Sequence, residues 1–160
     1  MSRKTRMPTW RVNVQIDGRY AGQVRPALLR RAAHAALRHQ AVEPGVELSI
    51  ALTGDATLHR LNKQFLGINS PTDVLAFPSE VSASHSRIAD FLLPKRPYLG
   101  DIAISFRRGS AQAKSAGHPV DAELQLLAVH GVLHLLGHDH ARRRDQARMW
   151  AAQKEILKGL

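Results

Sequence analysis

The chain has 160 residues, of which 44% are hydrophobic and 22% are charged, a length and composition typical of one soluble globular domain. It contains no cysteine, which excludes disulfide bonds, thiolate metal sites and cysteine nucleophiles. Residues 1–11 are basic and lack the apolar stretch of a secretory signal, and no run of about 18 apolar residues predicts a membrane span. We therefore expect a cytoplasmic protein without a membrane partner.

Positive charge is concentrated at the two ends of the chain, and the net charge is +10. Residues 1–42 contain nine Arg or Lys against Asp17 alone, and residues 141–160 contain six against Asp145 and Glu155. Such asymmetry favours a polyanionic partner, nucleic acid before membrane, although a solvated surface that binds nothing is the alternative. We expect the N-terminal third and the run from Arg142 to Arg144 to make most of this contact.

Hydrophobic periodicity predicts a single domain over residues 9–160, preceded by a disordered basic arm at residues 1–8. The expected strands are 10–16, 46–52, 73–78 and 99–105, and the expected helices are 26–39, 53–65, 106–116, 119–136 and 141–158. Residues 79–98 read as a long surface loop. This order predicts an α+β fold, a small sheet of about four strands with helices packed on it. In the last helix, the residues expected to be available for the core are Ala147, Trp150, Ala151 and Ile156.

The helix over 119–136 carries the most informative motif, in which His130 and His134 are followed by Gly137, His138 and His140. Between Leu124 and Leu136 the only polar side chains are Gln125 and these first two histidines. A helix with so few polar residues is expected to be buried on nearly every side. Imidazole rings buried in it need hydrogen-bond partners or a metal ion. Residues four apart stack on one face of a helix, which is the geometry by which two histidines share a metal ion.

The third metal ligand is either His138 or His140. In a continuous helix His138 would lie about 12 Å along the axis from His130, too far for nitrogens that each approach one ion to about 2.0–2.1 Å. Gly137 can end the helix in the left-handed conformation and turn the chain back. We therefore predict that His130, His134 and His140 bind the metal and that His138 does not.

Zinc fits this set best, because three histidines with an open fourth position form a known catalytic zinc arrangement. We predict one Zn²⁺ per chain, and the three histidines would act in catalysis through it. No strong general base is evident. Asp139 adjoins the site but can instead orient a ligand histidine, while Asp73 and Asp101 stand at strand ends and can bond to backbone. The alternative for any one of these histidines is a core imidazole bonded to a carbonyl group.

The same spacing occurs in metzincin peptidases, whose pattern is H-E-x-x-H-x-x-G-x-x-H. The chain has the metzincin-like histidine helix but carries Gly131 where those peptidases carry the glutamate that acts as general base. Peptide hydrolysis by the usual route loses its proton acceptor without that residue. A metallopeptidase is therefore a distant third hypothesis.

Three segments together resemble the YbeY family of bacterial rRNA maturation factors, described as metal-dependent single-strand endoribonucleases. They are Leu61-Asn62 followed by the stretch from Pro71 to Pro78, then Leu99-Gly100-Asp101-Ile102, then the histidine segment from His130 to His140. The resemblance extends over residues 10–158. It implies zinc bound by the three histidines, and it implies rRNA precursors and the small ribosomal subunit as partners, with no DNA. It also implies a role in rRNA processing, 16S rRNA 3′ end maturation and ribosome quality control.

Two positions depart from the family pattern. His138 stands where family members commonly have Tyr, and Leu66 stands where the pattern L-N-x-x-x-R usually places an arginine facing the metal cleft. Without that arginine, the chain lacks a cation that the family pattern places at the metal cleft, which puts efficient catalysis in question. The second hypothesis is therefore a ribosome-assembly factor that binds RNA, has a mainly structural zinc and cleaves little.

Overall fold

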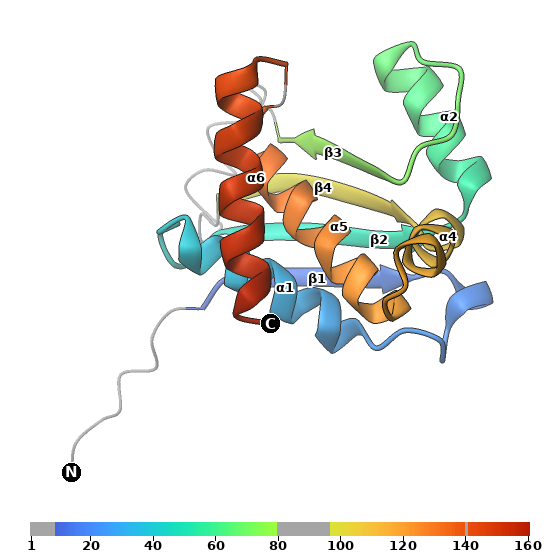
Figure 1. Ribbon diagram of the computed structural model, residues 1–160, viewed down its shortest axis with the longest axis horizontal. Coiled ribbons are helices and arrows are strands. Elements are labelled where there is room, and N and C mark those ends of the chain that lie inside the picture. Colours follow the sequence, from blue (N-terminus) through green and yellow to red (C-terminus); the bar gives the residue numbers. More distant parts are fainter. Residues whose placement is uncertain (1–8, 80–96, 140) are drawn as a thin grey trace, which may run out of the picture.

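The computed structural model describes residues 9–79, 97–139 and 141–160, and its elements follow the predicted order (Figure 1). The strands are β1 (Arg11–Ile16), β2 (Glu47–Thr53), β3 (Val74–Pro78) and β4 (Tyr98–Ser105). The helices are α1 (Pro26–His39), α2 (Asp55–Leu66), α4 (Phe106–Ala116), α5 (Val120–Leu135) and α6 (Arg143–Lys158). The predicted arm at 1–8, and residues 80–96 of the predicted loop, lie outside the described residues. A short 3-10 helix, Gly18–Tyr20, was not predicted.

The four strands form one mixed sheet in the order β1-β2-β4-β3. β1, β2 and β4 are parallel, and β3 runs antiparallel to β4 at the edge. The chain therefore leaves β1 and β2 through helices before it returns to the sheet, as parallel pairing requires. The predicted α+β class with about four strands is confirmed.

The two faces of the sheet differ in polarity because the side chains of each strand alternate. One face is apolar and buried under helices, and its central residues are Leu48, Ile50, Leu52, Ile102 and Ile104. The opposite face has a polar row in which Asn13, Ser49 and Asp101 lie beside one another in register. Only part of that face is covered, by a small apolar cluster of Leu58 from α2 with Leu75 and Ala103, which Leu61 and Phe77 flank.

Helix α5 lies at the centre of the helical layer (Figure 1). It contacts α1, α4 and α6, and it packs on β3 and β4. Its buried residues surround the axis, since they include Leu124, Leu127, Val129, Val132 and Leu133. The apolar run seen in the sequence is thus explained by neighbours on nearly every side. Among the described residues, no helix is both long and apolar enough to cross a membrane.

The core-facing side of α6 differs from the prediction. Met149, Ala152 and Ile156 are buried, and they form a stripe at spacings of three and four residues. Ala147 and Ala151 are exposed, and 57% of Trp150 is exposed. The prediction placed the large aromatic ring inward on hydrophobicity alone. The flexible Met149 side chain instead fills the interior position, which leaves Trp150 one residue out of phase with the stripe.

This packing predicts different costs for two neighbouring truncations. Met149→Ala should lower the free energy of unfolding by about 2–5 kcal/mol, because it opens a cavity in the core. Trp150→Ala, as the matched control, should change it by about 0.5 kcal/mol or less. Chemical denaturation of both variants measures the difference, and a larger loss for Trp150→Ala would show that α6 packs in the other phase.

Candidate metal centre

The C-terminal half of α5 presents its two histidines to the same point. The Nε2 atoms of His130 and His134 lie 3.0 Å apart, and the ring centroids are 4.6 Å apart with an interplanar angle of 69°. Both residues are partly buried. The four-residue spacing has therefore produced the convergence that the sequence predicted.

A residue of α6 fixes the orientation of the first ring. Nδ1 of His130 donates to Oε1 of Gln153 at 3.0 Å. In a neutral imidazole, one protonated nitrogen leaves the other with its lone pair exposed. Gln153 thus holds the tautomer in which His130 directs the lone pair of Nε2 towards His134, as outer residues commonly do for metal-binding histidines. Nothing in the sequence singled out Gln153, because only the packing of α6 on α5 brings it close.

The nitrogen pair fits a zinc ion. Two nitrogens about 2.0–2.1 Å from one tetrahedral ion lie roughly 3.3 Å apart, and the observed 3.0 Å needs only a small adjustment. The third predicted ligand, His140, lies outside the described residues. Within residues 9–79, 97–139 and 141–160, no three His, Cys, Asp or Glu side chains form a group that could hold a metal. The three-histidine assignment therefore stays a prediction.

Gly137 ends the helix as the sequence suggested. Its φ of 94° lies in the left-handed region. The backbone N–H of Gly137 donates to the carbonyl of His134, and that of His138 donates to the carbonyl of Leu133. These two bonds form a Schellman motif, in which the chain turns sharply away from the helix axis. Asp139 follows the turn, and its Oδ1 accepts from the backbone N–H of Ala141 at 3.1 Å. This bond gives Asp139 a structural role in the turn; its catalytic assignment stays untested.

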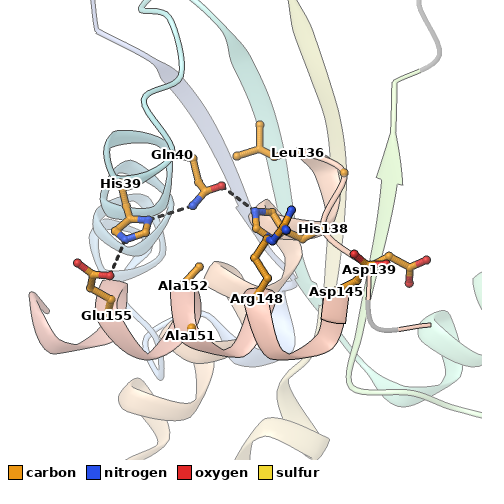
Figure 2. A pocket seen from close by; sticks show the side chains of 11 residues that line it. His39, Gln40, Leu136, His138, Asp139, Asp145, Arg148, Ala151, Ala152 and Glu155 are labelled. Atoms are coloured by element: carbon orange, nitrogen blue, oxygen red, sulfur yellow. Dashed lines mark hydrogen bonds and ion pairs between the residues drawn. The ribbon is translucent and has the colours of Figure 1, made fainter. Parts of the chain in front are cut away.

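Beyond this turn, His138 belongs to a chain of hydrogen bonds that runs across α1 and α6 (Figure 2). Its Nε2 donates to Oε1 of Gln40 at 2.7 Å, and Nε2 of Gln40 donates to Nδ1 of His39 at 3.0 Å. Nε2 of His39 then pairs with Glu155 at 3.2 Å. Burial is the main cause that lowers the pKa of His138, and the positive charge of Arg148 lowers it further. The lowered pKa favours the neutral form of His138, in which the protonated Nε2 donates to Gln40.

These residues line a cavity of about 550 Å³ that we name the His138 cavity. Its lining includes Gly137, His138, Asp139, Arg148 and Glu155 (Figure 2). Neither His130 nor His134 lines it. The structure therefore engages the Nε2 atom of His138 with α1 rather than with the histidine pair. The assignment of the third ligand to His140 rather than His138 stays a prediction.

Gly131 has a packing role that explains the missing glutamate. A Cβ atom placed on Gly131 would lie 2.7 Å from Cγ2 of Ile102 in β4, closer than real Cβ contacts. Gly131 therefore allows α5 to approach the sheet closely. A glutamate there would meet the packed interior of the domain, where an unpaired carboxylate is costly. The position that holds the general base in metzincins is filled here by the sheet.

Leu66 faces a different hollow from the one that His138 lines. It lies at the end of α2, is 56% exposed, and lines a groove of about 970 Å³ on the partly covered face of the sheet. The groove has polar residues such as Asn13 and Asp101 on its floor and Phe65 and Phe77 on its wall. Those two rings contact each other with centroids 5.3 Å apart. Neither described ligand histidine lines this groove.

Fold and site together define a class of protein: a mixed-sheet α+β domain in which a buried helix presents two histidines to one point. The sequence model of the family described as Endoribonuclease YbeY matches residues 17–160. The chain belongs to the YbeY family.

Curated relatives and a solved structure agree with this assignment. The chain is 47% identical to the endoribonuclease YbeY of Roseiflexus castenholzii, over 93% of this chain and 92% of that protein. It is 45% identical to the endoribonuclease YbeY of Chloroflexus aggregans (95% and 97%) and 36% identical to that of Bacillus cereus (82% and 83%). A solution structure of a Thermotoga maritima protein has a TM-score of 0.58 over 92% of this chain and 87% of that chain. At 23% identity that likeness concerns the fold alone.

The ligand assignment can be tested by single alanine substitutions. We expect His130→Ala, His134→Ala and His140→Ala each to abolish stoichiometric zinc, because each removes a nitrogen ligand. His138→Ala is the matched control and should retain one zinc per chain. Elemental analysis after dialysis measures the ratio. Loss of zinc in the control together with retention in His140→Ala would reverse the assignment of the third ligand.

The bond from His130 to Gln153 predicts a weaker effect. Gln153→Ala should keep the zinc site but reduce zinc affinity about 10–100-fold, as expected when the outer partner of a histidine ligand is lost. Lys154→Ala changes the neighbouring, exposed residue of α6 and should leave affinity unchanged. Competition with a chromophoric chelator gives both constants. Equal affinities for the two variants would show that Gln153 does not orient the ligand.

Proposed function

We propose that this chain is a zinc-dependent endoribonuclease that cleaves single-stranded RNA in rRNA processing, 16S rRNA 3′ end maturation and ribosome quality control. Membership of the YbeY family supports the enzyme class, since its curated relatives are named endoribonucleases. The main observation behind the proposed zinc site is that the Nε2 atoms of His130 and His134 lie 3.0 Å apart, while Gln153 orients the ring of His130. We expect the protein to act in the cytoplasm.

The donor set is suited to this chemistry. Imidazole ligands are neutral, so a bound zinc ion would keep its double charge, polarise a phosphate oxygen and lower the pKa of bound water. The chain's own residues supply the framework. Gln153 orients His130, the Schellman turn at Gly137 ends α5 just after His134, and Gly131 lets α5 lie close on the sheet.

RNA fits the charge of the chain. A net charge of +10 favours a polyanion, and phosphate contacts provide most of the affinity that is independent of sequence. We propose rRNA precursors as the substrate and the small ribosomal subunit as the assembly with which the protein acts. The positive net charge favours these RNA partners, but it does not indicate which phosphodiester bond is cleaved.

Leu66 favours a second candidate, an RNA-binding assembly factor whose zinc is mainly structural. A hydrophobic side chain stands where the family pattern has an arginine, and it faces the groove on the sheet rather than the described histidines. The negative charge that develops on the phosphate during cleavage would then be stabilised by one cation fewer. Exchangeable water on the zinc would favour the enzyme, and a fourth protein ligand would favour the structural role. Peptidase activity remains a distant third, because Ile102 occupies the space beside Gly131.

Cleavage of one single-stranded RNA under single-turnover conditions tests the proposal. We expect slow cleavage by the wild type, none by His134→Ala, and faster cleavage by Leu66→Arg. Loss of a transition-state donor typically costs about 2.7–4 kcal/mol, so the restored cation should raise the rate by about 100-fold or more. Ile68→Arg is the matched control, because it adds the same charge at a neighbouring residue that is 50% exposed.

The outcomes separate the candidates. Activity that persists in His134→Ala would mean that the metal is not the catalyst. Absence of cleavage in the wild type and in Leu66→Arg, with tight RNA binding in both, would favour the assembly factor. Equal stimulation by Leu66→Arg and Ile68→Arg would show that added charge alone, rather than a cation at position 66, raises the rate.

A further inference from the structure

Helix α1 carries an uncompensated positive surface. Between Pro26 and His39 the helix has three exposed arginines, Arg30, Arg31 and Arg38, and no acidic residue. Across residues 9–79, 97–139 and 141–160, no carboxylate forms an ion pair with any of these three guanidinium groups. This surface therefore presents positive charge that an anionic partner could neutralise.

The three arginines surround a cavity of about 470 Å³, which we name the α1 hollow. Arg30, Arg31, His34 and Arg38 line it from α1, and Gly159 and Leu160 line it from the C-terminal end of α6, which carries a partial negative charge. No Asp or Glu stands among the described residues that line it. Nε of Arg30 donates to the carbonyl of Val12 at 3.3 Å, which ties this side chain to β1. The hollow is thus a concave site with cations on its rim.

His34 lies between two of these arginines on the same face of α1. Its ring is half-buried beside Trp10, and its Nε2 is buried without a hydrogen-bond partner among the described residues. Burial lowers the pKa of His34, and the positive charges of Arg38 and Arg30 lower it further. Arg30, His34 and Arg38 follow one another at a spacing of four residues, so their side chains lie on one face of α1 around the hollow.

The axis of α1 leads from the hollow to the turn that follows the histidine pair. Arg31 and Gln40 are nine residues apart, or about 13.5 Å along a helix. Gln40, at the C-terminal end of α1, accepts the hydrogen bond from His138 in the turn that follows the histidine pair. The hollow and the turn that follows the histidine pair are therefore linked through one helix.

We propose that the α1 hollow binds backbone phosphates of the same RNA strand whose cleavage we assign to the histidine pair. This inference deepens the proposed function and rests on it for the identity of the strand. Arginine suits the role because its planar guanidinium binds phosphate through two donors at once. The hollow would add affinity and select substrates long enough to reach it, while the chemistry stays at the metal centre.

The test removes two charges from the hollow and compares the result with the same loss elsewhere. Arg31→Gln/Arg38→Gln leaves Arg30 and its bond to β1 intact. Arg60→Gln/Arg107→Gln is the control, since Arg60 on α2 and Arg107 on α4 are exposed and outside the hollow. Binding of a 12-nucleotide single strand is measured with chelator present, so that no cleavage occurs, across a salt series. Thermal melts confirm that all proteins are folded.

We expect the hollow variant to reduce the slope of log affinity against log salt by about 1.4, or roughly 0.7 for each lost contact, and the control by less than half of that. With metal, the wild type should cleave the 12-nucleotide strand at least 10-fold more efficiently than a 4-nucleotide strand, and the hollow variant should lose this preference. Equal slopes for the two variants, or a preference that survives, would overturn the proposal.

A further arm separates this inference from the proposed function. If the wild type binds RNA through the hollow but never cleaves it, the proposed RNA-binding role of the hollow is kept and the nuclease assignment is wrong. If the wild type cleaves both strands equally well, the nuclease assignment is kept and the proposed role of the hollow in binding RNA is wrong. Vesicles containing an anionic phospholipid supply the competing partner. Loss of vesicle binding in the hollow variant with unchanged RNA binding would assign the surface to a membrane and overturn the proposal.

Discussion

The close packing of α5 on the sheet is the constraint on which the rest of the structure depends. A helix that is apolar on nearly every side has to be covered on nearly every side, and the sheet, α1, α4 and α6 together provide that cover. Gly131 sets how closely α5 approaches β4, because any side chain there would meet Ile102. Interiors packed at this density respond to volume changes of a single methylene group. The positions of His130 and His134 are therefore fixed by the core.

A site on such a helix depends on the element that packs across it. The ring of His130 is oriented by Gln153, and Gln153 is placed by the burial of Met149, Ala152 and Ile156 in the same helix. The phase of α6 thus matters for chemistry as well as for stability. If Trp150 faced the core, α6 would rotate about its axis and Gln153 would turn away from α5.

The elements were predictable from the sequence because their signals are local. Alternating strands, the proline before α5 and the glycine after it determine each element from its own residues. The left-handed turn at Gly137 was predictable for the same reason. The choice between Met149 and Trp150, the bond from Gln153 and the contact between Gln40 and His138 were not predictable, because each joins segments far apart in the chain. The coming together of His130 and His134 needed only helical spacing, whereas the assignment of His140 stays a prediction.

The placement of Gly131 also bears on which reactions this scaffold can support. In the metzincin pattern the residue after the first histidine supplies the proton acceptor, but here that residue lies against β4. A base for hydrolysis therefore has to come from another element, from the metal-bound water or from the substrate itself. Hydrolysis of a phosphodiester depends less on a protein base than hydrolysis of a peptide, because the anionic oxygens of the phosphate can bind a metal and cations directly. The same buried packing that removes the glutamate thus favours a charged substrate.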